Sequence, residues 1–160
     1  MGAQVEIVPA DPTGDDVRPL LDEHLAEMYA TSPIESVHAL GAQELAHPSI
    51  TFFVARDAEG VVGTGALREL GSTEGELKSM RTAKRARGRG VGASMLEHLL
   101  SVARQRGYRA VRLETGVEDH FAPARRLYER YGFVAGEPFA DYRPDPNSVF
   151  MHLELEADGD

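Results

Sequence analysis

Apolar residues along the chain recur with two periods, one typical of helices and one typical of strands. Helical spacing runs from Thr13 to Tyr29, and Thr13 is a candidate N-cap for that helix. The clearest helical period extends from Gly90 to Arg106, keeps its apolar residues on one face, and stops at Gly107. Two further helices are expected, at about Ile34–Ala46 and at Pro123–Tyr131.

Runs of β-branched and aromatic residues between these segments predict strands. Two such runs, Ile50–Arg56 and Val61–Leu70, are joined by the turn residues Asp57–Gly60 and therefore predict a hairpin. Antiparallel strands come first and a strand–helix–strand unit follows, an order that implies a mixed α/β sheet with helices on both faces. The other expected strands are Gln4–Val8, Glu76–Thr82, Ala110–Thr115, Phe133–Ala135 and Ser148–Leu155.

The composition is typical of a globular chain with one domain. With 160 residues, 42% hydrophobic and 27% charged, residues 1–160 are expected to form one domain with its own core. The absence of cysteine excludes disulfides, thiolate metal sites and a cysteine acyl-enzyme. The six histidines show no metal-binding spacing, so we expect no metal. The first residues do not form a signal peptide and no apolar run approaches the ~20 residues of a membrane span, which favours a cytoplasmic protein.

Charge is distributed unevenly along the chain. The 26 acidic and 17 basic residues give a net charge of −9, which disfavours nucleic acid and anionic membranes as partners. The segment Leu77–Leu96 contains no acidic residue and contributes six positive charges, so the remainder carries −15. One basic segment in an acidic chain indicates a local site for a polyanionic small molecule.

The basic segment contains a glycine-rich loop, Thr82–Gly92, between an expected strand and the clearest helix. Glycines there let the backbone approach a ligand, and the N–H groups at a helix N-terminus favour an anion such as a pyrophosphate. A P-loop is excluded because no Lys-Ser or Lys-Thr follows the glycines. Three interpretations remain: a solvated basic turn, a dinucleotide fingerprint at Gly88, Gly90 and Ala93 with Glu114 about 20 residues further on, and an R-x-x-G-x-G signature at Arg87–Gly92.

The third interpretation gains support from a second motif. Residues Ala124–Phe133 read A-x-x-L-Y-x-x-x-G-F, and together with Arg87–Gly92 the sequence resembles the GNAT superfamily of acyl-CoA-dependent N-acyltransferases. This resemblance implies a mixed, mostly antiparallel sheet, flanked by about four helices, in which a parallel strand pair splays apart to admit the cofactor. The segments Ser32–Leu40, Glu76–Thr82 and Pro138–Tyr142 are similar to a bacterial subgroup sometimes named indole-acetate acetyltransferases.

The resemblance also implies a cofactor site for acetyl-CoA. The main chain of Met80 and Thr82, with Arg81 between them, would pair with the pantetheine amides as an added strand does. Phe121 stands where the family often has asparagine, and its ring would pack against the cofactor. Tyr128 would lie near the thioester sulfur and donate a hydrogen bond to the departing thiolate. The pyrophosphate would lie on the N–H groups of Arg87, Gly88, Arg89, Gly90, Val91 and Gly92.

The acceptor side requires a group that takes a proton, because an amine with a pKa of about 10.4 is charged near neutral pH. Without cysteine, direct attack in a ternary complex is the simple route. Glu76 is one candidate base and Glu114 the second, although either also fits a salt-bridged sheet residue. Strand alternation predicts that Glu76, Lys78 and Met80 share one face, where Lys78 would anchor a carboxylate.

The acceptor itself stays open at this stage. Glu35, Ser36, His38, Lys78 and Tyr142 are the candidate substrate-binding residues. The acidic remainder of the chain favours a cationic acceptor, whereas Lys78 and Arg81 favour one that also carries a carboxylate. The sequence therefore predicts an acetyl-CoA-dependent N-acetyltransferase for a small amine or amino-acid-like acceptor, with a homodimer allowed. The alternatives are a non-catalytic acyl-CoA-binding regulatory module and a dinucleotide-binding redox protein.

Overall fold

The computed structural model describes residues 5–31 and 42–155, which build one seven-stranded sheet in the order β1-β2-β3-β4-β5-β7-β6. All neighbouring strands run antiparallel except β4 and β5, which are parallel. This arrangement confirms the predicted mixed, mostly antiparallel sheet. The strands are β1 (Glu6–Pro9), β2 (Ile50–Asp57), β3 (Gly60–Glu69), β4 (Glu74–Thr82), β5 (Ala110–Gly116), β6 (Val134–Ala135) and β7 (Ser148–Glu154).

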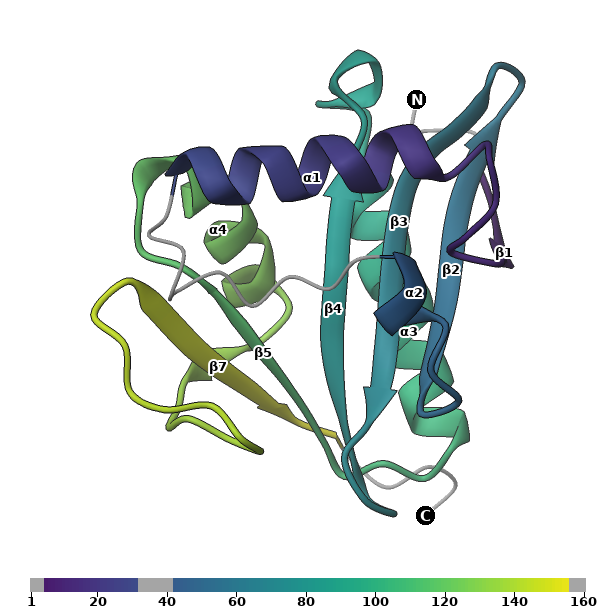
Figure 1. Cartoon of the computed structure of the whole chain (residues 1–160). Helices are drawn as coiled ribbons and strands as arrows, with labels where there is room; N and C mark the ends of the chain where they lie inside the picture. Colours follow the sequence, from purple (N-terminus) through teal and green to yellow (C-terminus); the bar gives the residue numbers. More distant parts are fainter. Residues whose placement is uncertain (1–4, 32–41, 156–160) are drawn as a thin grey trace.

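Helices cover both faces of the sheet, as the order of elements predicts. Figure 1 shows α1 and α2 in front of the strands and α3 behind them. No helix within the described ranges has the length and apolar character needed to cross a membrane. The helices are α1 (Arg18–Thr31), α2 (Ala42–Leu45), α3 (Val91–Gln105) and α4 (Ala122–Arg130), with short 3-10 turns η2 (Lys84–Ala86) and η3 (Asp119–Phe121).

Alternation along β2 separates two apolar cores. Phe52 and Val54 pack with residues of α1 and α2, whereas Phe53 and Ala55 belong to the larger core beneath α3. A side chain at Gly65 would place its Cβ 2.6 Å from Met95 Cγ, so the absence of that side chain lets α3 lie close to β3. The sheet therefore lies between two packed layers, and α3 lies directly against β3 and β4.

The start of the first helix differs from the prediction. Thr13 does not cap a helix, because Asp11 Oδ1 accepts hydrogen bonds from both the N–H and the hydroxyl of Thr13 and holds the chain in a turn. The helix begins at Arg18, and Pro19 follows in its first turn, where proline is favoured. The predicted helix at Ile34–Ala46 falls mostly outside the described residues, of which α2 is the described part.

The parallel strands β4 and β5 pair over only a short stretch. Their last paired residues are Glu76 and Arg112, whereas β5 remains paired with β7 up to Gly116 and Ser148. Beyond Glu76 the two strands diverge, as Figure 1 shows. The predicted splay between them is confirmed, and it leaves the edge of β4 after Glu76 unpaired on this side.

A β-bulge in β4 changes which residues share a face. Thr64 pairs with Arg81 and Ala66 with Lys78, so β4 contains one extra residue, and Ser79 adopts a φ of +54°. The Thr64 hydroxyl donates a hydrogen bond of 2.6 Å to the Ser79 carbonyl and closes the bulge. The predicted common face of Glu76, Lys78 and Met80 is therefore wrong for Met80, which packs into the core beneath α3, because one added residue reverses the alternation.

Candidate active site

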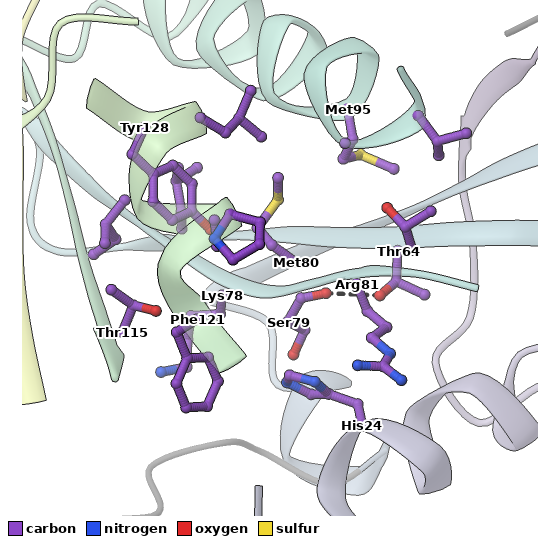
Figure 2. Close-up of a pocket in the computed structure, with 18 of the residues that line it drawn as sticks. His24, Thr64, Lys78, Ser79, Met80, Arg81, Met95, Thr115, Phe121 and Tyr128 are labelled. Carbon is purple, nitrogen blue, oxygen red and sulfur yellow. Dashed lines mark hydrogen bonds between the residues drawn. The ribbon is translucent and has the colours of Figure 1, made fainter. Parts of the chain in front are cut away.

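A cavity of about 670 Å³ fills the space between the diverging strands. It extends from the loop before α3, past α4, to the part of β4 that bears Glu76 and Lys78. Figure 2 shows Met80 and Tyr128 on one side of this cavity and Ser79, Arg81 and His24 on the other. The predicted site residues that line it are Glu76, Lys78, Met80, Arg81, Thr82, Arg87, Gly88, Gly90, Val91, Gly92, Glu114, Phe121, Tyr128 and Tyr142.

Four predicted site residues are not placed in this lining. Arg89 lies beside the cavity and faces away toward Asp57. Glu35, Ser36 and His38 lie outside the described residues.

The glycine loop turns into α3 through two residues in left-handed conformation. Gly88 has a φ of +81° and Gly90 a φ of +80°, a region that other residues enter only with strain. No side chain caps the N-terminus of α3 at Gly90. The first N–H groups of a helix have no partner within the helix, so this end of α3 presents free donors to the cavity. Donors and helix dipole together suit an anion such as a phosphate group.

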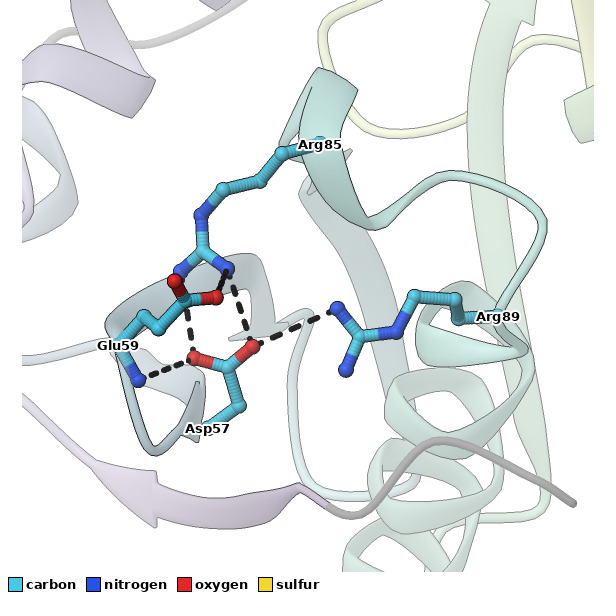
Figure 3. Close-up of polar contacts among 4 residues, drawn as sticks. All are labelled: Asp57, Glu59, Arg85 and Arg89. Carbon is cyan, nitrogen blue, oxygen red and sulfur yellow. Dashed lines mark hydrogen bonds and ion pairs between the residues drawn. The ribbon is translucent and has the colours of Figure 1, made fainter.

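The arginines around this loop divide into two groups. Arg85 donates two hydrogen bonds to Asp57, at 3.1 and 3.2 Å, and one of 3.1 Å to Glu59, which ties η2 to the β2–β3 turn (Figure 3). These hydrogen bonds from Arg85 lower the pKa of Asp57 to about 2. Arg89 reaches the same carboxylate at only 3.5 Å, and Arg87 lies 3.9 Å from Glu27. Arg85 therefore braces the loop, while Arg87 and Arg89 are held loosely.

Arg81 connects β4 to α1 through a buried ion-pair cluster. Its guanidinium donates to Glu27 at 2.5 and 2.6 Å and to Glu23 at 2.6 Å, and its side chain is only 7% exposed. Burial would lower the pKa of Arg81, but its hydrogen bonds to Glu27 and Glu23 outweigh that effect and raise the pKa. Both terminal nitrogens are thus committed to carboxylates of α1.

Tyr128 presents a buried phenol to the cavity from α4. Its ring packs edge-on against Phe133, with centroids 5.7 Å apart, and the residue is 6% exposed. Its hydroxyl has no hydrogen-bond partner among the described residues. Burial raises the pKa of Tyr128 well above its usual value, so the phenol stays protonated and remains a hydrogen-bond donor.

Glu76, Lys78 and Tyr142 form a hydrogen-bonded triangle at the point where β4 and β5 separate. The Tyr142 hydroxyl donates to Glu76 Oε2 at 2.5 Å, and Lys78 Nζ donates to the same oxygen at 3.1 Å and to the Tyr142 hydroxyl at 2.8 Å. Glu76 is only 1% exposed. Burial, followed by the Glu76 carboxylate, raises the pKa of Tyr142. A buried carboxylate that already accepts two hydrogen bonds is suited to hold its neighbours in place.

Glu114, the second candidate base, lies on β5 across the cavity. Its Oε2 accepts a hydrogen bond of 2.7 Å from the Ser148 hydroxyl, and the residue is half-buried. It lines the same cavity as Tyr128 and Lys78. Both candidate bases line the cavity, and Glu114 is the more exposed of the two.

Several lining residues escaped the sequence analysis. The helix α1 contributes His24, Glu27 and Met28, because it packs across the end of β4, a long-range contact that no local pattern encodes. The only sequence signal for these α1 residues was that polar residues occur within the amphipathic pattern of that helix. The bulge adds Ser79, whose buried hydroxyl has no hydrogen-bond partner among the described residues. The other missed lining residues are Thr64, Leu77, Ala86, Ala93, Met95, Leu113, Thr115, Pro123, Ala124, Leu127 and Arg130.

Comparison with known proteins identifies the family of the chain. The model of the Acetyltransferase (GNAT) family matches residues 17–133. The chain is 49% identical, over 91% of its length and 96% of the relative, to YsnE of Bacillus subtilis (strain 168), described as an uncharacterized N-acetyltransferase. It is 42% identical to the IAA acetyltransferase of Azospirillum brasilense, over 84% of this chain and 86% of that protein.

A solved structure agrees with this match over nearly the whole chain. The protein is from Klebsiella pneumoniae and is assigned as an acyl-CoA N-acyltransferase. Its structure superposes with a TM-score of 0.77 at 31% identity, covering 96% of this chain and 99% of the other. Family model, relatives and fold agree, and the chain belongs to the GNAT family of N-acetyltransferases.

Proposed function

We propose that the chain forms one acetyltransferase domain that transfers an acetyl group from acetyl-CoA to a small amine or amino-acid-like acceptor within a ternary complex. The observation that carries this proposal is the cavity between β4 and β5. It brings together a helix N-terminus with free donors, an unpaired strand edge, a protonated tyrosine and a half-buried carboxylate. Each corresponds to a requirement of acyl transfer from a thioester.

The donor half of the cavity fits acetyl-CoA. The N–H groups at the start of α3 suit the pyrophosphate, with the loosely held Arg87 beside them and Arg89 at the margin. The unpaired edge of β4 beyond Glu76 offers main-chain groups to the pantetheine amides. A cofactor bound in this way directs its thioester toward Met80 and Tyr128.

Transfer then needs three proton movements. The acceptor ammonium loses one proton to solvent and becomes a nucleophile, and its nitrogen attacks the thioester carbonyl carbon. The C–N bond forms as the C–S bond breaks, and the nitrogen loses a second proton, which Glu114 accepts. The departing thiolate receives a hydrogen bond from Tyr128 and takes up one proton from solvent, so that CoA leaves as the free thiol. Glu76 holds Lys78 and Tyr142 in position and is too enclosed to act as the base.

Two alternatives lead to different observations. A dinucleotide-binding redox protein requires a doubly wound parallel sheet, whereas the observed sheet has a single parallel pair among the described strands. A non-catalytic acyl-CoA-binding module would need the glycine loop. It would not need the buried hydroxyl of Tyr128, which faces the cavity and has no hydrogen-bond partner among the described residues.

The direct test combines binding and turnover. Acetyl-CoA is expected to raise the melting temperature, whereas NAD and NADP are expected to leave it unchanged. A thiol-release assay over a panel of amines and amino acids is then expected to find acceptors that accelerate CoA release. Stabilisation by acetyl-CoA without acceleration by any amine would overturn the enzymatic proposal in favour of a binding module.

A further inference from the structure

Around Glu76 on β4, two cations face a single carboxylate. Glu76 is shared by two cations, since Lys78 Nζ lies 3.1 Å from Oε2 and an Arg68 terminal nitrogen lies 3.5 Å from Oε1. Neither Lys78 nor Arg68 has a second carboxylate within ion-pair distance among the described residues. One carboxylate for two cations leaves an excess of one positive charge around Glu76. Of the two cations, the Lys78 side chain is 7% exposed and the Arg68 side chain 35% exposed, so Lys78 carries the charge that is shielded from solvent. Such a site favours a ligand anion.

Of the two cations beside Glu76, Lys78 is the one that lines the cavity. An ammonium group has three N–H donors, and those of Lys78 make hydrogen bonds to Glu76 and Tyr142 only, within the described part of the chain. One donor is left, and Lys78 lines the cavity although its side chain is only 7% exposed. The triangle fixes the ammonium in place, so little side-chain freedom is lost when a ligand binds.

The other basic candidate on β4 is committed elsewhere. Arg81 was expected to favour a carboxylate, but both of its terminal nitrogens bind Glu23 and Glu27 of α1. The role of carboxylate anchor therefore falls to Lys78.

Glu114 supplies the complementary charge on the opposite strand. It lines the same cavity, and its negative charge is close enough to contribute to the raised pKa of Tyr142, whose hydroxyl binds Lys78. The Ser148 hydroxyl donates a hydrogen bond to Glu114 Oε2 and helps to hold this carboxylate in place on β5. The cavity thus has a fixed cation and a carboxylate on its two diverging strands.

We infer that the acceptor is an amino acid or a similarly short amino-carboxylate, held by its carboxylate at Lys78 and by its amine on the side of Glu114. This assignment rests on the proposed acetyltransferase function and narrows its acceptor class. It replaces the open choice between a plain cationic amine and an amine that also carries a carboxylate. Lys78 acts as a specificity-determining residue and Glu114 as the group that receives the amine proton.

The test compares matched acceptors that differ only in the carboxylate. Amino acids from the panel and their C-terminal amides are assayed by thiol release, with kcat/KM measured for each pair. The wild-type protein is expected to prefer the acids by about tenfold or more, the range of a charge-assisted hydrogen bond. Lys78→Met is expected to remove this preference by lowering kcat/KM for the acids only. Equal use of acids and amides by the wild-type protein, or an equal loss for both in Lys78→Met, would overturn the assignment.

Two further variants keep the test informative if Lys78→Met folds poorly because Glu76 loses its buried cationic partner. Glu76→Gln keeps the ammonium and is expected to retain the preference for acids. The double variant Glu76→Gln/Lys78→Met removes both charges and is expected to lose it; retention by the double variant would contradict the assignment. If no amine of either kind is acetylated, the proposed function itself fails, whereas acetylation without a preference for acids overturns only the acceptor class.

Discussion

Glu76 on β4 and Arg112 on β5 are the last residues that the two parallel strands pair, and the cavity opens directly beyond them. Beyond this point β5 stays paired with β7 on its other side, up to Gly116 and Ser148, so β5 remains part of the sheet where it separates from β4. The same pair of strands thus holds the sheet together at one end and contributes the cavity walls at the other.

The hydroxyl of Tyr128 is expected to matter for turnover and not for cofactor binding. Tyr128→Phe removes a donor to the departing thiolate, so kcat is expected to fall about ten- to a hundredfold, while the Kd of acetyl-CoA changes by less than about twofold. Tyr131→Phe is the matched control, because its hydroxyl donates to Glu97 on the exposed side of α3. Steady-state kinetics with calorimetric binding checks both variants. An unchanged kcat in Tyr128→Phe would remove this residue from the mechanism.

The loosely held Arg87 is expected to bind the cofactor phosphates. Arg87→Ala is expected to weaken acetyl-CoA binding by about tenfold, with a smaller dependence of Kd on salt, because one charge-assisted contact is lost. Arg104→Ala removes an exposed arginine at the far end of α3 and provides the control for net charge. Equal Kd values for the two variants would show that the phosphates lie elsewhere.

Asp57 is expected to support cofactor binding although its charge opposes that of the phosphates. Asp57→Asn loosens Arg85 and with it the loop before α3, so the Kd of acetyl-CoA is expected to rise by about three- to tenfold through lost preorganisation. Charge alone predicts the opposite change, because the variant makes the site more positive. Tighter binding by Asp57→Asn would therefore contradict the bracing role.

The lowered pKa of Asp57 also implies that its ion pair with Arg85 is lost at low pH. The folded carboxyl has a pKa of about 2, whereas its ordinary value is 3.8, so the folded state favours the charged form. The stability that it contributes is complete above about pH 4 and is lost as the pH falls toward 2. Melting temperatures of the wild-type protein and Asp57→Asn are therefore expected to differ near neutral pH and to converge over this range. A constant difference between them would argue against the ion pair.

The raised pKa values of three tyrosines predict how the stability of the fold changes at high pH. Burial raises the pKa of Tyr128 and of Tyr142, and the hydrogen bond to Glu97 raises that of Tyr131. Above about pH 10 the unfolded chain releases these protons before the folded chain does, so stability is expected to fall as the pH rises further. Absorbance titration should show that these three tyrosines ionise late, together with unfolding. Early ionisation of these three tyrosines in the folded protein would contradict the burial of Tyr128 and Tyr142 and the hydrogen bond of Tyr131 to Glu97.

The parts of the molecule that the sequence predicts well are those encoded locally. The period of α3, the turn at Asp57–Gly60 and the glycines of the loop each depend on neighbouring residues, and all lie where predicted. The start of α1 was missed because Asp11 captures Thr13 in a turn. The pattern of alternation could not reveal the bulge at Ser79, which places Met80 on the opposite face.

The sequence could not predict which carboxylates pair with the basic residues, and the reason is a different one. Arg81, Arg85 and Arg89 look alike in sequence as phosphate ligands, yet each meets carboxylates from a distant segment. Those carboxylates are brought near by α1 and by the β2–β3 turn, whose positions depend on the whole sheet. Charge counts along the chain therefore identify the cationic segment but do not show which of its charges are available to a ligand.

Two-substrate initial-rate kinetics test direct transfer within the cavity most directly. With an acceptor found in the panel, rates measured over a grid of acetyl-CoA and acceptor concentrations are expected to give intersecting double-reciprocal lines, and mass spectrometry is expected to find the acetyl group on the acceptor nitrogen. Parallel lines, together with an acetylated form of the protein isolated in the absence of acceptor, would show a covalent intermediate and contradict direct transfer.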